Sequence, residues 1–130
     1  MKLMAIDYGE RRVGVASTDE MGDFALPRAV WPNDKTLVDK VLKFREEEEI
    51  GKIIIGESRD LSGNSNPIQK AIDSFKSELE TRLSAQSSEV EIVCHPEVFT
   101  TLEARRLQGR TEMTDASAAA LILKNYLESR

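Results

Sequence analysis

The strongest constraint on the fold is a run of β-branched residues in the middle of the chain. Residues 52–56 read Lys-Ile-Ile-Ile-Gly, between a charged amphipathic segment and a polar segment with Gly and Ser. A short apolar run in this position is typical of a strand that is buried on both faces of a parallel sheet. Parallel strands need long crossover connections, so helices are expected to cover both faces of the sheet.

The rest of the chain supplies the expected partners of this strand. Apolar and alternating runs predict five strands, over residues 2–6, 13–17, 24–31, 52–56 and 90–94. Helical spacing predicts four helices, over residues 35–49, 67–83, 100–108 and 115–127. Asn33 or Asp34 is the expected cap of the first helix, and Thr114 that of the last. Pro27 lacks a backbone N–H, which predicts that its strand is an edge strand or a bulged strand.

The order of these elements predicts an α/β domain with a ribonuclease H-like architecture. Three consecutive strands come first, and strands that alternate with helices follow. We therefore expect a five-stranded mixed sheet, antiparallel on one side and parallel on the other, with helices on both faces. A length of 130 residues fits one domain, so residues 1–130 are expected to form a single unit.

Composition excludes several classes of protein. With 18 Lys and Arg against 23 Asp and Glu, the net charge is −5, which argues against a protein that coats nucleic acid nonspecifically. The single cysteine excludes a disulfide framework and suits a reducing compartment. No apolar run has the length of a membrane span, and the predicted first strand leaves no room for a signal peptide. A cytoplasmic protein without a membrane partner is expected.

Acidic residues recur where the strands of the predicted sheet end. Asp7 and Glu57 each follow a strand, Glu97 lies just beyond the fifth strand, and Asp115 opens the last helix. Ligands of open α/β sheets bind beyond the carboxyl ends of the strands. A cluster of carboxylates there needs a counter-ion, and Mg²⁺ prefers oxygen ligands. Singly, each residue also suits an ordinary turn, loop or helix N-terminus.

Three segments resemble the motifs of a known family. Residues 5–16 (AIDYGERRVGVA), 97–104 (EVFTTLEA) and 115–123 (DASAAALIL) are similar, in this order, to the three motifs of the YqgF family, relatives of the RuvC Holliday-junction resolvases. The resemblance implies a ribonuclease H-like fold, a metal-dependent nuclease and, for many members, processing of the 5′ end of pre-16S rRNA. It assigns the catalytic and metal-binding carboxylates to Asp7, Glu97 and Asp115.

The chain departs from the family pattern at two places. Where the family usually has Asp-Glu-Arg, this chain has Pro-Glu-Val at residues 96–98, and Gly-Glu-Ser at 56–58 replaces the common Gly-Leu-Pro. Glu57 is closer to the RuvC arrangement, in which the fourth strand supplies a carboxylate. The resemblance therefore leaves open whether three carboxylates bind the metal or four, with Glu57 as the additional ligand.

Basic and hydroxyl side chains near the acidic motifs suit phosphate binding, because the guanidinium fork matches phosphate oxygens. The candidates are Arg11, Arg12, Thr100, Arg105, Arg106 and Arg110. For each arginine, an ordinary surface role is the alternative. His95, the single histidine, is interpreted as structural rather than as a proton-transfer group near Glu97.

These features favour a metal-dependent endonuclease that cleaves structured nucleic acid with Mg²⁺ or Mn²⁺, with pre-rRNA as the favoured substrate. One alternative is a Holliday-junction resolvase, which would act on branched DNA as a homodimer. Another is a non-catalytic RNA-binding factor of ribosome assembly. The sequence does not distinguish a monomer from a homodimer. An actin-like ATP-binding module is disfavoured because 130 residues provide only one of its two lobes.

Overall fold

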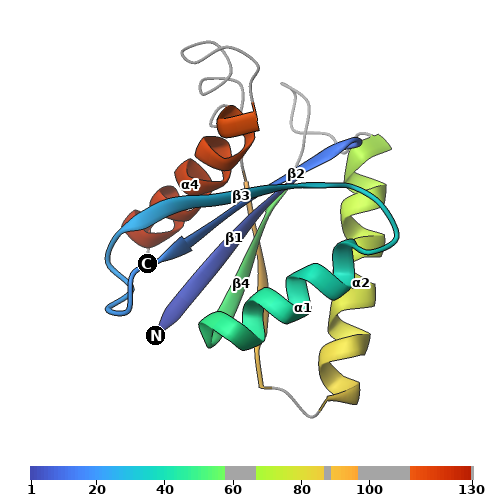
Figure 1. The fold of residues 1–130 in the computed structure, drawn as a ribbon, viewed down its shortest axis with the longest axis horizontal. Coiled ribbons are helices and arrows are strands. Elements are labelled where there is room, and N and C mark those ends of the chain that lie inside the picture. The colour runs from blue at the N-terminus through green and yellow to red at the C-terminus, as the bar shows by residue number, and fades with distance from the viewer. Residues whose placement is uncertain (58–66, 87–88, 97–111, 130) are drawn as a thin grey trace.

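The computed structural model describes residues 1–57, 67–86, 89–96 and 112–129. The chain forms an α/β fold in which strands precede and then alternate with helices (Figure 1). In order, the elements are β1 (Lys2–Tyr8), β2 (Arg12–Thr18), β3 (Ala25–Pro32), α1 (Leu37–Glu48), β4 (Ile50–Glu57), α2 (Pro67–Ala85), β5 (Glu91–Pro96) and α4 (Glu112–Ser129). The predicted helix over residues 100–108 lies outside the described residues.

The five strands form one mixed sheet in the order β3-β2-β1-β4-β5. The pairs β1–β2 and β2–β3 are antiparallel, while β1–β4 and β4–β5 are parallel. Residues Ile53–Ile55 are fully buried, as expected for a strand that is covered on both faces. The predicted mixed sheet and its division into two sides are confirmed.

Strand β3 is both an edge strand and a bulged strand. Val15 of β2 pairs with Ala29, whereas the next residue, Ala16, pairs with Pro27, so that Arg28 is left between them. The position of Pro27 at this irregularity follows from its missing backbone donor. The prediction made from Pro27 is confirmed.

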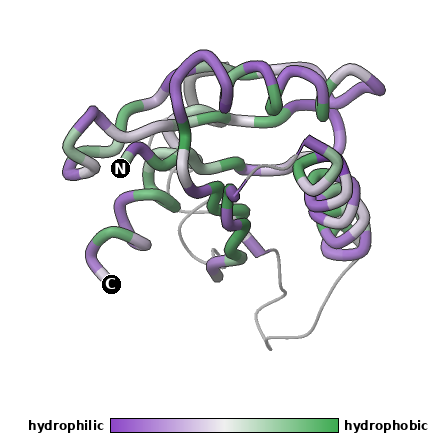
Figure 2. Tube along the Cα trace, turned by 90° about the horizontal axis from the view of Figure 1, so that it is seen from below, coloured by the Kyte–Doolittle hydropathy of each residue, from purple (hydrophilic) through white to green (hydrophobic). Residues whose placement is uncertain are grey.

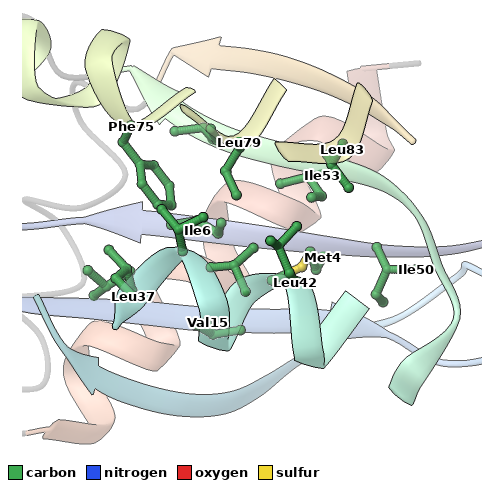
Figure 3. Close-up of a cluster of buried hydrophobic side chains, with 14 of the residues drawn as sticks. Met4, Ile6, Val15, Leu37, Leu42, Ile50, Ile53, Phe75, Leu79 and Leu83 are labelled. Carbon is green, nitrogen blue, oxygen red and sulfur yellow. The ribbon is translucent and has the colours of Figure 1, made fainter. Parts of the chain in front are cut away.

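Helices cover the sheet from both sides, and each side has its own hydrophobic core. Figure 2, turned from Figure 1 to look along the sheet, shows α1 and α4 on opposite sides of the strand layer. Under α1 and α2, fifteen buried residues form what we call the large cluster, including Met4, Ile6 and Leu79 (Figure 3). Under α4, a second group forms the small cluster, which consists of Leu3, Ala5, Ala16, Ile54, Ala119, Ile122 and Leu123.

Both predicted helix caps are wrong. The cap of α1 is Thr36, and Asp34 instead accepts hydrogen bonds at its Oδ1 from the Thr36 backbone N–H (2.9 Å) and hydroxyl (2.5 Å). This local bond forms a turn that holds the chain before the helix. Helix α4 already begins at Glu112, so Thr114 lies inside it. Glu112 and Met113 have good helix propensity and extend the helix toward its N-terminus.

Two strands run further than the patterns predicted. Asp7 lies inside β1 and pairs with Gly14, and Glu57 is the last residue of β4, opposite Pro96. The polar residues at these ends continue the backbone pairing although they interrupt the apolar pattern. Because Asp7 and Glu57 both lie within strands, the alternation of side chains determines the face of the sheet to which each belongs.

Candidate functional site

Asp7 is a buried carboxylate near the carboxyl end of the central strand. Asp7 has only 4% of its surface exposed to solvent. Along β1, Met4 and Ile6 belong to the large cluster, whereas Leu3 and Ala5 belong to the small cluster. Side chains alternate along a strand, so Asp7 continues the line of Leu3 and Ala5 on the α4 face.

The strands on either side of Asp7 present glycine. Asp7 pairs with Gly14 of β2, and Ile6 pairs with Ile55 of β4, so that the next step places Asp7 beside Gly56. Gly56 pairs in turn with His95 of β5. We call the line formed by Gly14, Asp7, Gly56 and His95 the Asp7 row. Within this row, Asp7 has no side chain next to it on the sheet.

Helix α4 lies over the strand that carries Asp7. The small cluster joins Ala119 and Ile122 of α4 to Ala5 of β1, as the sequence interpretation required for Asp115 to approach Asp7. Residue 115 precedes Ala119 by four positions and Ile122 by seven, which puts it on the same stripe of the helix. The side chain of Asp115 itself lies outside the described ones.

The direction of α4 brings its first turns toward the Asp7 end of the sheet. Near the end of α4, the Tyr126 hydroxyl accepts a hydrogen bond from Nζ of Lys52, at 2.9 Å. Lys52 lies at the start of β4, so the C-terminal part of α4 is next to the beginning of this strand. The N-terminal part of α4 therefore points to the end where β1 and β4 finish (Figure 1).

Glu57 belongs to the opposite face. Ile53 and Ile55 of β4 are in the large cluster, and alternation assigns Glu57 to that side. Cys94, which pairs with Ile55, lies close enough to Glu57 to be affected by its charge. Burial raises the pKa of the Cys94 thiol, and the negative charge of Glu57 also raises it. The backbone thus directs Asp7 toward α4 and Glu57 toward α2.

Two exposed arginines lie in the hairpin between β1 and β2, just after Asp7. The turn is tight, because a Cβ on Gly9 would come within 2.6 Å of the Arg12 carbonyl oxygen. Asn33 fastens it to the end of β3: its Nδ2 donates to the Gly9 carbonyl at 2.7 Å, and its backbone N–H donates to the Arg11 carbonyl at 2.8 Å. Arg12 is two residues from Gly14 on β2 and shares the face of Asp7.

The remaining predicted site residues cannot be placed. Glu97, Thr100, Arg105, Arg106 and Arg110 lie outside the described residues. Among the described residues, no three His, Cys, Asp or Glu side chains come together as a metal site would require. Asp7 is the one proposed ligand whose side chain is described on the α4 face.

The sequence interpretation missed a group of side chains on this face, which extends from the start of β4 to the Asp7 row. Lys52 donates to Tyr126 and lies 3.4 Å from the Glu91 carboxylate, and the rings of His95 and Tyr126 have centroids 5.9 Å apart. These residues come from β4, β5 and α4, far apart in the sequence, so no local pattern relates them. The alternation of side chains along β5 could have shown the face of His95. Ile92 packs on the large cluster, so His95, three residues later, faces the other side of the sheet.

Solved structures identify the fold of the chain. Thermus thermophilus RuvC in complex with a Holliday junction substrate matches with a TM-score of 0.61 and 13% identity, over 100% of this chain and 96% of that one. The fowlpox virus Holliday junction resolvase matches with a TM-score of 0.58 and 14% identity, over 100% of both chains. At these identities the likeness shows the fold, which is the ribonuclease H-like fold of the RuvC-like resolvases.

Sequence comparison gives the family. The model of the RuvX family, described as Holliday junction resolvase, matches residues 1–129, and the chain belongs to this family. Curated relatives named "Putative pre-16S rRNA nuclease" include one from Chlorobium phaeobacteroides, 31% identical over 98% of this chain and 92% of the relative. Another, from Desulforudis audaxviator, is 32% identical over 100% and 96%. The expected resemblance to RuvC-like nucleases is confirmed, and no described helix is long and apolar enough to cross a membrane.

Proposed function

We propose that the chain is a cytoplasmic, metal-dependent endonuclease that cleaves structured RNA in the 5′-end processing of pre-16S rRNA. The observation that carries this proposal is the position of Asp7. A carboxylate that is 4% exposed, near the end of the central strand and beside glycine on both neighbouring strands, has the burial and the position expected of a metal ligand in this fold. The names of the curated relatives support the substrate.

The proposed ligands fit a hard divalent cation. Asp7, Glu97 and Asp115 all offer carboxylate oxygens, the donors that Mg²⁺ and Mn²⁺ prefer. The burial of Asp7 agrees with this, because an ionised carboxylate with so little exposure needs compensation by a cation or by hydrogen bonds. When bound, such an ion supplies an activated water and stabilises the charge that develops on the phosphate.

The protein contributes position and charge. Pairing on both sides of β1 fixes the backbone of Asp7, and the neighbouring glycines carry no side chain on this face. Arg11 and Arg12 lie exposed in the hairpin that follows β1. They are suited to bind phosphates on one side of the bond that is cleaved. We assign the same role to Thr100, Arg105, Arg106 and Arg110.

The second candidate is a Holliday-junction resolvase, which the description of the matching family favours. A resolvase cuts two opposing strands, so it needs two copies of the site in a symmetric dimer. Analytical ultracentrifugation measures the oligomeric state and, together with the substrate that is cut, distinguishes the RNA nuclease from the resolvase. A strictly monomeric chain that cuts RNA supports the first, and a dimer that cuts only four-way DNA supports the second.

The decisive test is cleavage of labelled substrates with Mg²⁺ or Mn²⁺. One substrate carries the 5′ junction of pre-16S rRNA and the other is a four-way DNA junction. Asp7→Asn is compared with wild type and with Asp23→Asn, a matched change at an exposed aspartate. We expect metal-dependent RNA cleavage that Asp7→Asn abolishes and Asp23→Asn retains. RNA binding without cleavage in wild type would instead support a non-catalytic assembly factor.

A further inference from the structure

The α4 face of the sheet carries a ring pair in line with Asp7. His95 lies on the Asp7 row, separated from Asp7 by Gly56. Neighbouring strands are about 4.8 Å apart, so the two residues are about 10 Å apart across the sheet. The intervening position is Gly56, so no side chain of the sheet stands between Asp7 and His95 along this row.

His95 lies against an aromatic residue of the covering helix. The His95 and Tyr126 rings have centroids 5.9 Å apart and planes inclined by 52°, and both residues are partly exposed. The arrangement leaves part of the ring surface accessible. Partly exposed rings beside a proposed phosphodiester site are the groups on which unpaired bases stack.

Lys52 holds the tyrosine in this position. Its Nζ donates to the Tyr126 hydroxyl and lies 5.5 Å from the centre of the ring, and Glu91 balances its charge at 3.4 Å. The hydrogen bond to the Tyr126 hydroxyl raises the pKa of Lys52. The ring pair is therefore anchored on the sheet as well as on α4.

We propose that His95 and Tyr126 form a stacking platform for an unpaired base of the nucleic-acid strand whose phosphodiester lies at Asp7. The proposal rests on the proposed nuclease function and names the part of the substrate that this face receives. Stacking uses the faces of the rings and does not require a change in the protonation of His95. It also favours a strand that is locally single-stranded, because a paired base is already stacked within its duplex.

The test is binding of a single-stranded RNA that contains 2-aminopurine, whose fluorescence falls when it stacks. The full chain is used in EDTA, so that binding is measured without cleavage. His95→Ala is compared with His95→Phe, which keeps a ring, and with His95→Leu, which fills the space without one. Phe24→Ala is the matched control, because Phe24 is an aromatic residue 68% exposed in the turn before β3.

We expect His95→Ala and His95→Leu to weaken RNA binding by roughly 5- to 100-fold, the range for loss of one stacked base. His95→Phe and Phe24→Ala should bind as wild type does. Quenching of 2-aminopurine should persist only in the variants that keep a ring at position 95. A fully paired duplex should bind equally to all variants.

Three results would overturn the platform: wild-type affinity and quenching in His95→Leu, equal losses in His95→Phe and His95→Ala, or an equal loss in Phe24→Ala. Thermal unfolding identifies a variant that has lost its fold, and His95→Leu provides the reading if His95→Ala unfolds. If quenching behaves as expected but wild type shows no metal-dependent cleavage, the platform stands and the nuclease function fails. If wild type cleaves RNA and His95→Leu binds normally, the nuclease function stands and the platform fails.

Discussion

The two faces of the sheet are built from different residues. All fifteen residues of the large cluster under α1 and α2 are larger than alanine, and Phe75 and Leu79 fill the space between helix and sheet. The small cluster under α4 includes Ala5, Ala16 and Ala119, and the row beyond it consists of two glycines, a carboxylate and a histidine. The first face supplies most of the buried apolar surface. The second brings a helix close to the sheet through alanines, and the Asp7 row that follows has small or polar residues instead of large apolar ones.

This difference teaches how one sheet can hold both a core and a site. Apolar burial stabilises a fold in proportion to the area removed from water. A buried carboxylate opposes folding unless it is compensated. The strands reconcile the two because consecutive residues, such as Ile6 and Asp7, point to opposite sides. Substitutions on the two faces should therefore affect stability and activity separately.

The largest effect is expected from Asp7→Asn. We expect cleavage to fall by at least about 1000-fold, because a ligand of the metal ion is lost. The variant should still fold, because asparagine has nearly the same shape as aspartate and keeps an oxygen and a nitrogen for hydrogen bonds. Single-turnover cleavage and urea unfolding measure the two quantities, with Asp23→Asn as control. If Asp7→Asn cleaves as wild type does, Asp7 is not a metal ligand and the α4 face does not hold the active site.

The next largest effect is expected on the other face. Leu79 is fully buried in the large cluster, and Leu79→Ala should cost about 2–5 kcal/mol of unfolding free energy through lost burial and a cavity. Cleavage per folded molecule should not change. Leu26→Ala, at a residue 46% exposed, is the control and should have little effect. If Leu79→Ala lowers cleavage per folded molecule, the two faces are coupled and the prediction is wrong.

A substitution that enlarges the small cluster should affect both quantities. Ala119 is fully buried between α4 and the sheet, so Ala119→Leu is expected to cost about 1–3 kcal/mol by overpacking. It should also lower cleavage, because it moves α4 relative to Asp7. The comparison variant is Leu79→Met, which conserves volume on the other face. Urea unfolding and cleavage are measured for both variants. Unchanged cleavage by Ala119→Leu would show that the position of α4 does not affect the active site.

The smallest effect concerns Lys52. Its hydrogen bond to the Tyr126 hydroxyl raises its pKa in the folded state, with desolvation acting in the opposite direction. A raised lysine pKa contributes stability that is complete below the unfolded pKa of about 10.4 and is lost as pH rises through the folded value. Wild type should therefore lose slightly more stability than Lys52→Gln above about pH 10. Chemical unfolding at pH 8 and in this alkaline range measures the difference, and parallel curves would contradict the assignment.

The sequence predicted the sheet better than it predicted the boundaries. Three isoleucines indicated the central parallel strand, and Pro27 indicated an edge and a bulge, because both signals act through burial or through a missing backbone donor. The cap of α1 was wrong because Asp34 forms its own turn before Thr36. Local patterns do not reveal which of two competing hydrogen-bond arrangements wins.

The candidate site was predictable one residue at a time but not as an arrangement. Asp7 is predicted from its place after an apolar run and Asp115 from its place at the start of the last predicted helix, and the family resemblance assigns metal binding to both. The sequence pattern places Glu57 in the loop after the fourth strand, whereas β4 includes it and so gives its side chain a defined face. The pairing of His95 with Tyr126 needs one side of α4 to reach β4 and β5 while the helix packs mainly on β1, β2 and β3, and no single segment of the sequence reveals this tertiary packing.

The placement of Asp7 between an antiparallel and a parallel neighbour also sets the order in which the site is made. Strand β2 follows β1 after a short turn, whereas β4 and α4 follow only after long stretches of chain. Pairings between residues that are distant in sequence form later in folding than local ones. The hairpin can thus form during synthesis while Gly56 and Asp115 are still absent. If Asp115 is a ligand as proposed, a newly made chain completes its metal site only after α4 has been synthesised.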